Sequence, residues 1–191
     1  GSSPKMAEAS AIFGLEPELP TVLIIGGSLG ARTMNESVLS NLETIEKSGI
    51  QFIWQTGGYY HKDIQAQLQQ RGKPANLYVT DFISHMDQAY KAADLVISRA
   101  GASSISELCL LGKPSILVPS PNVAEDHQTC NAMALVKRDA ALMVKDAEAR
   151  ERLIPLALST VADKNRLTVL GENAYKMAFK DSARIIAEEV I

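Results

Sequence analysis

Cysteine and long hydrophobic runs are both scarce in this sequence, and each shortage excludes a class of protein. Only two of the 191 residues are cysteine, Cys109 and Cys130. They form no CxxC pair and have no histidine at zinc-ligand spacing, which excludes a disulfide-stabilised scaffold and a structural zinc site. No apolar run approaches the roughly 18 residues of a membrane-spanning helix. We therefore expect no transmembrane segment, and no signal peptide at this N-terminus.

An excess of positive charge is also missing. Lysine and arginine total 19 against 22 aspartate and glutamate residues, a formal net charge of −3. A protein that binds nucleic acid usually carries a clustered basic excess, so we expect no nucleic-acid partner. The length fits one domain. We interpret residues 1–20 as a tag remnant (Gly1 to Ser3) and an N-terminal lead-in, and residues 21–191 as the folded domain.

What is present is an alternation of strand and helix patterns. Residues 21–25 are a continuous apolar, β-branched run, which is typical of a strand buried on both faces. Further strands are predicted at 51–55, 77–80, 95–98, 115–118 and 141–144. A first helix carries Met34, Val38, Leu42 and Ile45 and ends at Gly49. Later helices are predicted at 59–70, 86–93, 104–111, 126–137, 147–160, 163–178 and 181–190. Ser84 is expected to cap the helix at 86–93.

Repeated strand–helix units predict an α/β fold: a doubly wound, Rossmann-like parallel sheet of about six strands with helices on both faces. Ligands of such sheets bind beyond the carboxyl ends of the strands, where the strand order reverses. With the order 3-2-1-4-5-6, that point lies between the first and fourth strands.

The loops after these two strands consist of small residues. They are Gly26-Gly27-Ser28-Leu29-Gly30-Ala31 and Ser98-Arg99-Ala100-Gly101-Ala102-Ser103-Ser104. Both lead into predicted helix N-termini, where free N–H groups and the helix dipole favour an anion such as phosphate. The loops are therefore either two tight turns that need small residues or the two sides of a nucleotide site.

Several nucleotide sites are disfavoured. Ser28 interrupts the G-x-G-x-x-G pattern of dinucleotide-binding proteins, and the second strand ends in Gln55 instead of an acidic residue, which argues against NAD. The sequence has no Walker loop and no Asp-x-Asp pair for a metal–diphosphate site. We therefore expect no cofactor and metal-independent binding, in which helix N-termini stabilise the charge of a leaving group.

Two further features each have two interpretations. Ser104-Ile105-Ser106-Glu107 fits a capping box, so Glu107 either caps its own helix or points to the crevice and accepts the hydroxyls of a ribose. The polar segment from Asn122 to Asn131 is either a solvated loop and helix start or a site for sugar hydroxyls. His127 has no nucleophile or acid placed beside it, which argues against a catalytic base.

Four motifs together resemble the MurG family of glycosyltransferases. They are Gly26-Gly27-Ser28-x-Gly30-Ala31-Arg32-x-x-Asn35, Asp81-Phe82-Ile83, Ser98-Arg99-Ala100-Gly101-Ala102-x-x-x-Ser106-Glu107 and Glu125-Asp126-His127-Gln128-x-x-Asn131-Ala132. The resemblance covers residues 21–190. It implies the C-terminal, donor-binding half of a two-domain GT-B enzyme. Such an enzyme transfers GlcNAc from UDP-GlcNAc to lipid I (undecaprenyl-pyrophosphoryl-MurNAc-pentapeptide) and so forms lipid II. This reaction is a step of peptidoglycan synthesis, which serves cell wall biogenesis, cell shape and cell division.

The resemblance also implies roles for individual residues, all of them in donor binding and none catalytic. The residues implied for the diphosphate are Gly27, Ser28, Gly30, Ala102, Ser103 and Ser104. The backbone of Ile83 would read the uracil edge and Glu107 would hold the ribose diol. Gln128, together with His127 and Asn131, would hold the GlcNAc hydroxyls, and Arg99 would be structural. Two positions depart from the family: Leu29 stands where many members carry Gln, and His127 replaces a Gln.

The family's N-terminal half has no counterpart in this sequence. In the family it binds the lipid I acceptor, touches the membrane and supplies the general base. We therefore expect this chain to bind UDP-GlcNAc without transferring the sugar, and the full-length protein to be cytoplasmic and peripheral on the inner face of the bacterial membrane. The alternatives are a stand-alone UDP-GlcNAc-binding subunit of a two-subunit lipid-linked glycan transferase, a UDP-GlcNAc 2-epimerase-like isomerase and a non-enzymatic nucleotide-sugar sensor.

Overall fold

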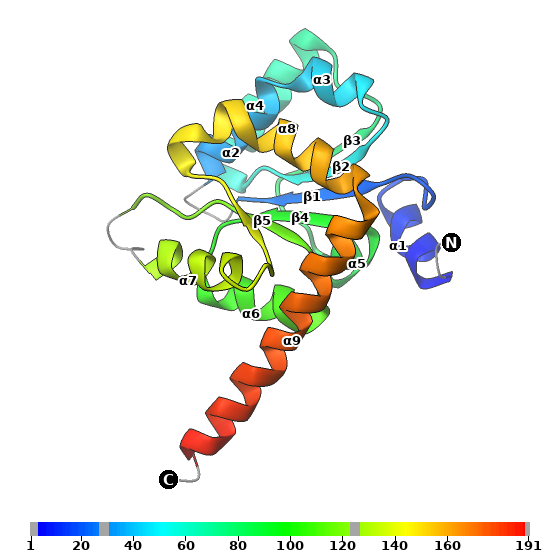
Figure 1. Cartoon of the computed structure of the whole chain (residues 1–191). Helices are drawn as coiled ribbons and strands as arrows, with labels where there is room; N and C mark the ends of the chain where they lie inside the picture. The colour runs from blue at the N-terminus through cyan, green and yellow to red at the C-terminus, as the bar shows by residue number, and fades with distance from the viewer. Residues whose placement is uncertain (1–3, 27–30, 123–126, 190–191) are drawn as a thin grey trace.

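The computed structural model describes residues 4–26, 31–122 and 127–189, and strands alternate with helices along them (Figure 1). The strands are β1 Thr21–Ile25, β2 Gln51–Gln55, β3 Leu77–Thr80, β4 Leu95–Ser98, β5 Ser115–Leu117 and β6 Leu142–Met143. The helices are α1 Pro4–Ile12, α2 Ala31–Leu39, α3 Leu42–Lys47, α4 Gly58–Arg71, α5 Met86–Ala92, α6 Ala102–Leu111, α7 His127–Val136, the 3₁₀ helix η2 Asp146–Glu148, α8 Ala149–Ala162 and α9 Lys164–Glu189.

The strands form one parallel sheet in the order β3-β2-β1-β4-β5-β6, as predicted. The order reverses between β1 and β4, which confirms the doubly wound topology. The last residues of the strands lie in one row across the sheet: Thr80, Gln55, Ile25, Ser98, Leu117 and Met143. The loops that follow the strands therefore all leave from the same edge, which we call the carboxyl edge.

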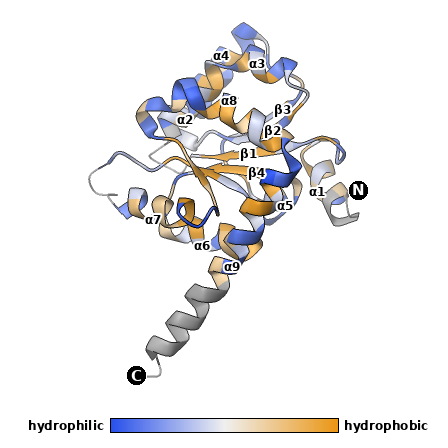
Figure 2. Cartoon of the chain, in the orientation of Figure 1, coloured by the Kyte–Doolittle hydropathy of each residue, from blue (hydrophilic) through white to orange (hydrophobic). Residues whose placement is uncertain are grey.

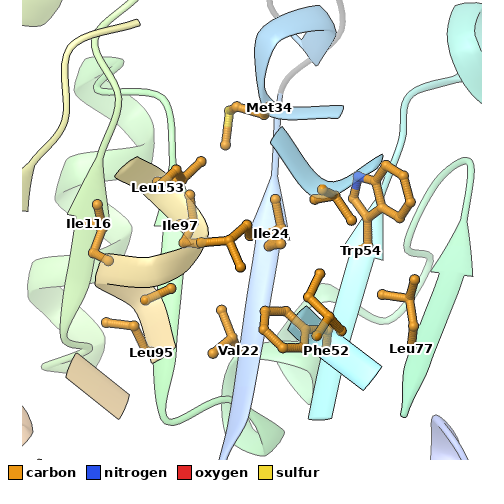
Figure 3. Packing of buried hydrophobic residues seen from close by; sticks show 14 of the residues in the cluster. Val22, Ile24, Met34, Phe52, Trp54, Leu77, Leu95, Ile97, Ile116 and Leu153 are labelled. Atoms are coloured by element: carbon orange, nitrogen blue, oxygen red, sulfur yellow. The ribbon is translucent and has the colours of Figure 1, made fainter. Parts of the chain in front are cut away.

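A hydrophobic layer on each face of the sheet explains why the strand sequences are continuous apolar runs. Alternate residues of β1 point to opposite faces, so Val22 and Ile24 belong to one buried cluster and Leu23 to the other. The first cluster lies under α2, α3, α4 and α8, and Figure 3 shows Ile24 between Trp54 and Ile97 within it. The second lies under α5, α6, α7 and the first part of α9 (Figure 1). Both faces of the central strands are therefore covered. Figure 2 shows β1 and β4 in orange, the colour of hydrophobic residues.

The helix predicted through Met34 and Ile45 is interrupted. The structure has two helices, α2 and α3, with Ser40 and Asn41 between them. The Asn41 side chain donates a hydrogen bond to the Ser37 carbonyl at 2.7 Å, and its backbone leaves the helical conformation at φ −123°. Asparagine side chains compete with the helical hydrogen bonds in this way, and here the competition ends α2.

Two other helix predictions were wrong in detail. The helices predicted at 163–178 and 181–190 are one helix, α9, and the residues around the expected break include neither glycine nor proline. Ser84 was expected to cap α5, but the N-cap position is occupied by His85, with no side-chain cap. In both cases the local pattern was correct about the helix and wrong about its end.

The lead-in at residues 1–20 packs onto the domain through α1. Ala9 and Phe13 are buried in the second cluster, and the Phe13 ring meets the Tyr78 ring edge to face at 5.2 Å between centroids. Edge-to-face contact of this kind adds to the hydrophobic contribution of burial. The sequence patterns did not indicate this helix.

Across the residues that the structure describes, there is no helix with the length and apolar character needed to span a membrane.

Candidate functional site at the carboxyl edge of the sheet

The candidate site lies where β1 and β4 run side by side at the carboxyl edge. Ile25, the last residue of β1, is opposite Ser98, the last residue of β4. The loop after β1 leads to α2, and the loop after β4 leads to α6. The predictions for Gly27, Ser28 and Gly30 lie outside the described residues. The last residues of β1 and β4 lie side by side at the reversal of strand order, as predicted.

The first turn of α6 begins directly beyond β4. Gly101 is the N-cap residue, with extended backbone (φ −67°, ψ 150°), and its carbonyl accepts the first helical hydrogen bond, from the Ile105 N–H at 3.0 Å. Ala102 and Ser103 are exposed and Ser104 is half-buried. The N–H groups of a first helical turn have no carbonyl partner within the helix, and the dipole adds positive potential there. This turn is therefore a candidate anion-binding element.

Glu107 does not form the capping box that its spacing suggested. Because α6 begins at Ala102, Ser104 lies inside the helix and Glu107 lies in its second turn. The carboxylate is exposed on the same helix face as Ser103, one turn further along. Of the two interpretations, capping is thus wrong, and the side chain is available at the surface beside the candidate anion-binding turn.

Tyr90 is the neighbour of Glu107. It lies on α5 and is 5% exposed, in the second hydrophobic cluster. Burial, followed by the negative charge of Glu107 and a hydrogen bond to it, raises the pKa of the Tyr90 hydroxyl to about 12. The hydroxyl therefore keeps its proton near neutral pH.

Gln128 and Asn131 are attached to the loop after β4. Gln128 Oε1 accepts hydrogen bonds from the N–H groups of Ala100 at 3.2 Å and Ser120 at 2.8 Å. Asn131 Nδ2 donates to the Ala100 carbonyl at 3.0 Å. These two side chains of α7 thus hold together the loops that follow β4 and β5. His127, the first residue of α7, is exposed.

Ile83 is a buried residue of the loop between β3 and α5. Its side chain is 4% exposed, and its N–H donates to Gln55 Oε1 at 2.9 Å. The backbone of Ile83 was expected to read a uracil edge, and its N–H already has a protein partner. Gln55 was not singled out as a site residue, although an amide at the end of a buried strand was a signal that it binds a neighbouring loop.

Arg99 has the structural role that was expected. Its Nη1 forms an ion pair with Asp146 Oδ1 at 2.7 Å, and the two side chains are only 11% and 16% exposed. The same nitrogen donates to the Val118 carbonyl at 3.3 Å. Asp146 Oδ2 also accepts a hydrogen bond from Thr33 Oγ1 at 3.1 Å. Asp146 thereby connects the first turn of α2 to the end of β4, and nothing in the local sequence marked it for this role.

Asn35, a member of the first motif, is also structural. Its Nδ2 donates to the Thr56 carbonyl and its Oδ1 accepts from Trp54 Nε1, both at 2.9 Å, in a buried position. The asparagine therefore anchors α2 to the end of β2. This leaves the loop before α2 with a fixed helix behind it.

The described part of the chain has no group of three or more His, Cys, Asp or Glu side chains placed to hold a metal ion. The polar groups at the carboxyl edge are a helix N-terminus, an exposed carboxylate, an exposed imidazole and amide side chains. Such groups bind anions and hydroxyls.

Comparison with known proteins places the chain among glycosyltransferases. The model of the glycosyltransferase family 28 C-terminal domain matches residues 21–187. A protein of Bacteroides thetaiotaomicron named UDP-N-acetylglucosamine–N-acetylmuramyl-(pentapeptide) pyrophosphoryl-undecaprenol N-acetylglucosamine transferase is 58% identical over 98% of this chain and 51% of its own length. A protein of the same name from Bacteroides fragilis is 57% identical over 98% of this chain and 50% of its own length.

A solved structure agrees with these relatives. The crystal structure of Acinetobacter baumannii MurG is similar with a TM-score of 0.72 and 30% identity, covering 91% of this chain and 49% of that one. The chain spans about half the length of the relatives that it matches.

Proposed function

The chain belongs to the glycosyltransferase family 28 C-terminal domain family, and from that membership we propose that it is the donor-binding half of an enzyme that transfers GlcNAc from UDP-GlcNAc to lipid I. The observation that carries the proposal is the first turn of α6, which begins at the reversal of strand order with an exposed carboxylate one turn behind it. The names of the similar proteins supply the donor and the acceptor.

The spacing along α6 suits a nucleoside diphosphate. A helix rises 1.5 Å per residue, so Glu107 lies about 6 Å along the axis from Ser103. A diphosphate at the N–H groups of Ala102, Ser103 and Ser104 therefore leaves the ribose beside Glu107, whose carboxylate accepts hydrogen bonds from both hydroxyls of the diol. The uracil then lies toward Ile83. Because the Ile83 N–H already donates to Gln55, we propose that the Ile83 carbonyl accepts the hydrogen bond from the uracil.

The sugar lies toward α7 in this arrangement. His127 is exposed at the first position of α7, and its ring nitrogens are suited to hydroxyl groups. Gln128 and Asn131 support this part of the site indirectly, because they hydrogen-bond to Ala100 in the loop that leads into α6. We propose that His127 is a direct sugar contact and that Gln128 and Asn131 combine sugar contact with bracing.

The chemistry divides between the two halves of such an enzyme. The acceptor hydroxyl of lipid I attacks the anomeric carbon of GlcNAc, the bond from that carbon to the diphosphate breaks, and UDP leaves with its negative charge. The N-termini of α6 and α2 in this half stabilise that charge without a metal ion. On this proposal, the acceptor site, the general base and contact with the inner face of the membrane belong to the part of the full-length enzyme that this chain does not span.

Titration calorimetry tests the proposal with UDP-GlcNAc, UDP and NAD as ligands. UDP-GlcNAc and UDP are expected to bind and NAD is not. Glu107→Ala is expected to weaken the binding of both uridine ligands by about 1–3 kcal/mol, since it removes a charged hydrogen-bond acceptor. Glu46→Ala is the matched control, because Glu46 is also exposed but lies on α3, away from the carboxyl edge.

Binding of NAD without the uridine ligands, or equal losses in the two variants, contradicts the proposal. The same preparation is expected to leave lipid I unmodified in the presence of UDP-GlcNAc.

A further inference from the structure

We infer that the side-chain amide of Gln55 reads the base of the nucleotide. Its Nε2 group donates a hydrogen bond to the O4 oxygen of uracil and thereby makes the site prefer uridine ligands over cytidine ligands. The inference rests on the proposed function, since it adds a residue to the same nucleotide site. It starts from one contact in the structure, the hydrogen bond of 2.9 Å from the Ile83 N–H to Gln55 Oε1.

That contact fixes the orientation of the Gln55 amide. The Ile83 N–H donates to an oxygen, so Oε1 faces Ile83 and Nε2 is the other atom of the same planar amide. Gln55 is the last residue of β2 and only 9% exposed. Its Nε2 group has no hydrogen-bond partner among the described residues, where Ser115 Oγ alone is a buried side-chain polar atom without one. The Nε2 donor is therefore open to a ligand at the carboxyl edge.

Gln55 lies on the face of the sheet that α6 covers. Successive residues of a strand alternate between the two faces, so Gln55 shares a face with Ile53, a member of the second hydrophobic cluster. Its partner on β1 is Ile25, which packs against the same cluster, and Leu108 of α6 belongs to that cluster as well. The amide is therefore on the same side of the sheet as the positions proposed for the diphosphate and the ribose.

The loop that carries the Ile83 carbonyl is held by its own hydrogen bonds. The Thr80 hydroxyl donates to the Phe82 carbonyl at 3.1 Å, and the Phe82 N–H donates to Asp81 Oδ1 at 2.8 Å. The bond to Gln55 attaches the next residue of this loop to the end of β2. The Nε2 donor and the Ile83 carbonyl acceptor are therefore a fixed pair, joined through the contact between the two residues.

A donor beside an acceptor matches uracil and not cytosine. Uracil has the O4 acceptor next to its N3–H donor, whereas cytosine has an amino donor next to its N3 acceptor. Cytosine would therefore place its amino group against Gln55 Nε2 and its N3 against the Ile83 carbonyl, and polar groups left unpaired in a buried site are costly. C4 lies across the ring from the nitrogen that carries the ribose. With the ribose beside Glu107, O4 is thus the group that reaches the buried end of β2.

The test measures the dissociation constants of UDP and CDP for the chain and for Gln55→Glu at about pH 8, where a glutamate is ionised. The wild-type chain is expected to prefer UDP by about 10-fold or more. Gln55→Glu keeps an oxygen for the Ile83 N–H but has no donor, so the preference for UDP is expected to fall by about 10-fold or more. Gln51→Glu is the matched control, because Gln51 is buried at the other end of the same strand, and it is expected to leave the preference unchanged.

Two analogues test the same contact in the unaltered chain, independently of how well the variants fold. Sulfur is a weak acceptor, so 4-thio-UDP is expected to bind about 2- to 10-fold more weakly than UDP, and 2-thio-UDP as well as UDP. Equal binding of UDP and 4-thio-UDP, or an unchanged preference for UDP in folded Gln55→Glu, overturns the inference, while UDP binding that depends on Glu107 keeps the proposed function intact. A wild-type chain that binds no UDP overturns both.

Discussion

Side chains from distant parts of the sequence meet at Asp146, beside the carboxyl edge of the sheet. Its two oxygens accept hydrogen bonds from Arg99 and Thr33, which lie at the end of β4 and in the first turn of α2. The ion pair with Arg99 is mostly buried. A buried charge that loses its partner is costly, so the contribution of Asp146 is best measured by removing it.

We predict that Asp146→Ala destabilises the chain by about 2–4 kcal/mol, because it removes a mostly buried carboxylate that forms an ion pair with Arg99 and accepts a hydrogen bond from Thr33. Urea unfolding measures the loss. Glu148→Ala is the matched control in the same 3₁₀ helix: its ion pair with Arg152 is about half exposed, and such pairs contribute less than about 1 kcal/mol. Equal costs for the two variants would show that the Arg99 pair is no more important than a surface pair.

Tyr90 predicts a pH dependence of stability. Its pKa rises from 10.0 in the unfolded chain to about 12 in the folded one, through burial and then Glu107. Below pH 10 both states hold the proton and the contribution of Tyr90 is complete. As the pH rises from 10 to about 12 the unfolded state loses the proton first, so this contribution is lost.

The comparison of the chain with Tyr90→Phe isolates that effect. The unfolding free energy of the chain is expected to fall relative to that of Tyr90→Phe between about pH 9 and about pH 11.5, because phenylalanine has no proton to lose. Urea titrations across this range measure it. A constant difference between the two proteins would mean that the Tyr90 pKa is not raised.

At the scale of elements, α6 and α9 meet at two glycines. Gly112 ends α6 in the left-handed conformation at φ 62°, and its carbonyl lies 2.7 Å from the place where a Cβ on Gly171 of α9 would be. The absence of a side chain at Gly171 therefore sets how closely the two helices approach. The helix propensity of alanine and the clash act in opposite directions here.

We predict that Gly171→Ala destabilises the chain by about 1–3 kcal/mol, because the clash with backbone exceeds the gain of up to about 1 kcal/mol that alanine brings to a helix. Thermal unfolding with a two-state fit measures it. Gly58→Ala at the start of α4 is the control: its Cβ would meet nothing within 4 Å, and it is expected to be neutral or slightly stabilising. A neutral Gly171→Ala would show that α9 shifts without cost.

The elements were predictable to different degrees. All six strands followed from apolar, β-branched runs, and their order is the common order of doubly wound sheets that was expected. The helix ends were less predictable. Gly101 is an N-cap without a side chain, so the capping pattern that begins three residues later, at Ser104, was mistaken for the start of α6. Asn41 ended α2 through a side-chain bond that periodicity does not reveal.

At the scale of the whole molecule, the site is built from loops that are far apart in sequence but leave one edge of the sheet. Its location and its general polarity were predictable, because parallel strands bring their following loops together. The bracing contacts of Asp146, Gln55 and Gln128 were not, since each joins segments tens of residues apart and depends on the finished packing. The family resemblance supplied the ligand, which no contact within the chain specifies.

The first turn of α7 has a consequence for how such a domain acquires new donor sugars. His127 points to solvent, whereas Gln128 and Asn131 hold the backbone of Ala100. On the proposed arrangement, a substitution at His127 changes which donor sugar is recognised and leaves the first turn of α6 intact. Variation at the other two disturbs both at once. Donor specificity can therefore change by substitution at His127, whereas Gln128 and Asn131 are constrained by their structural role.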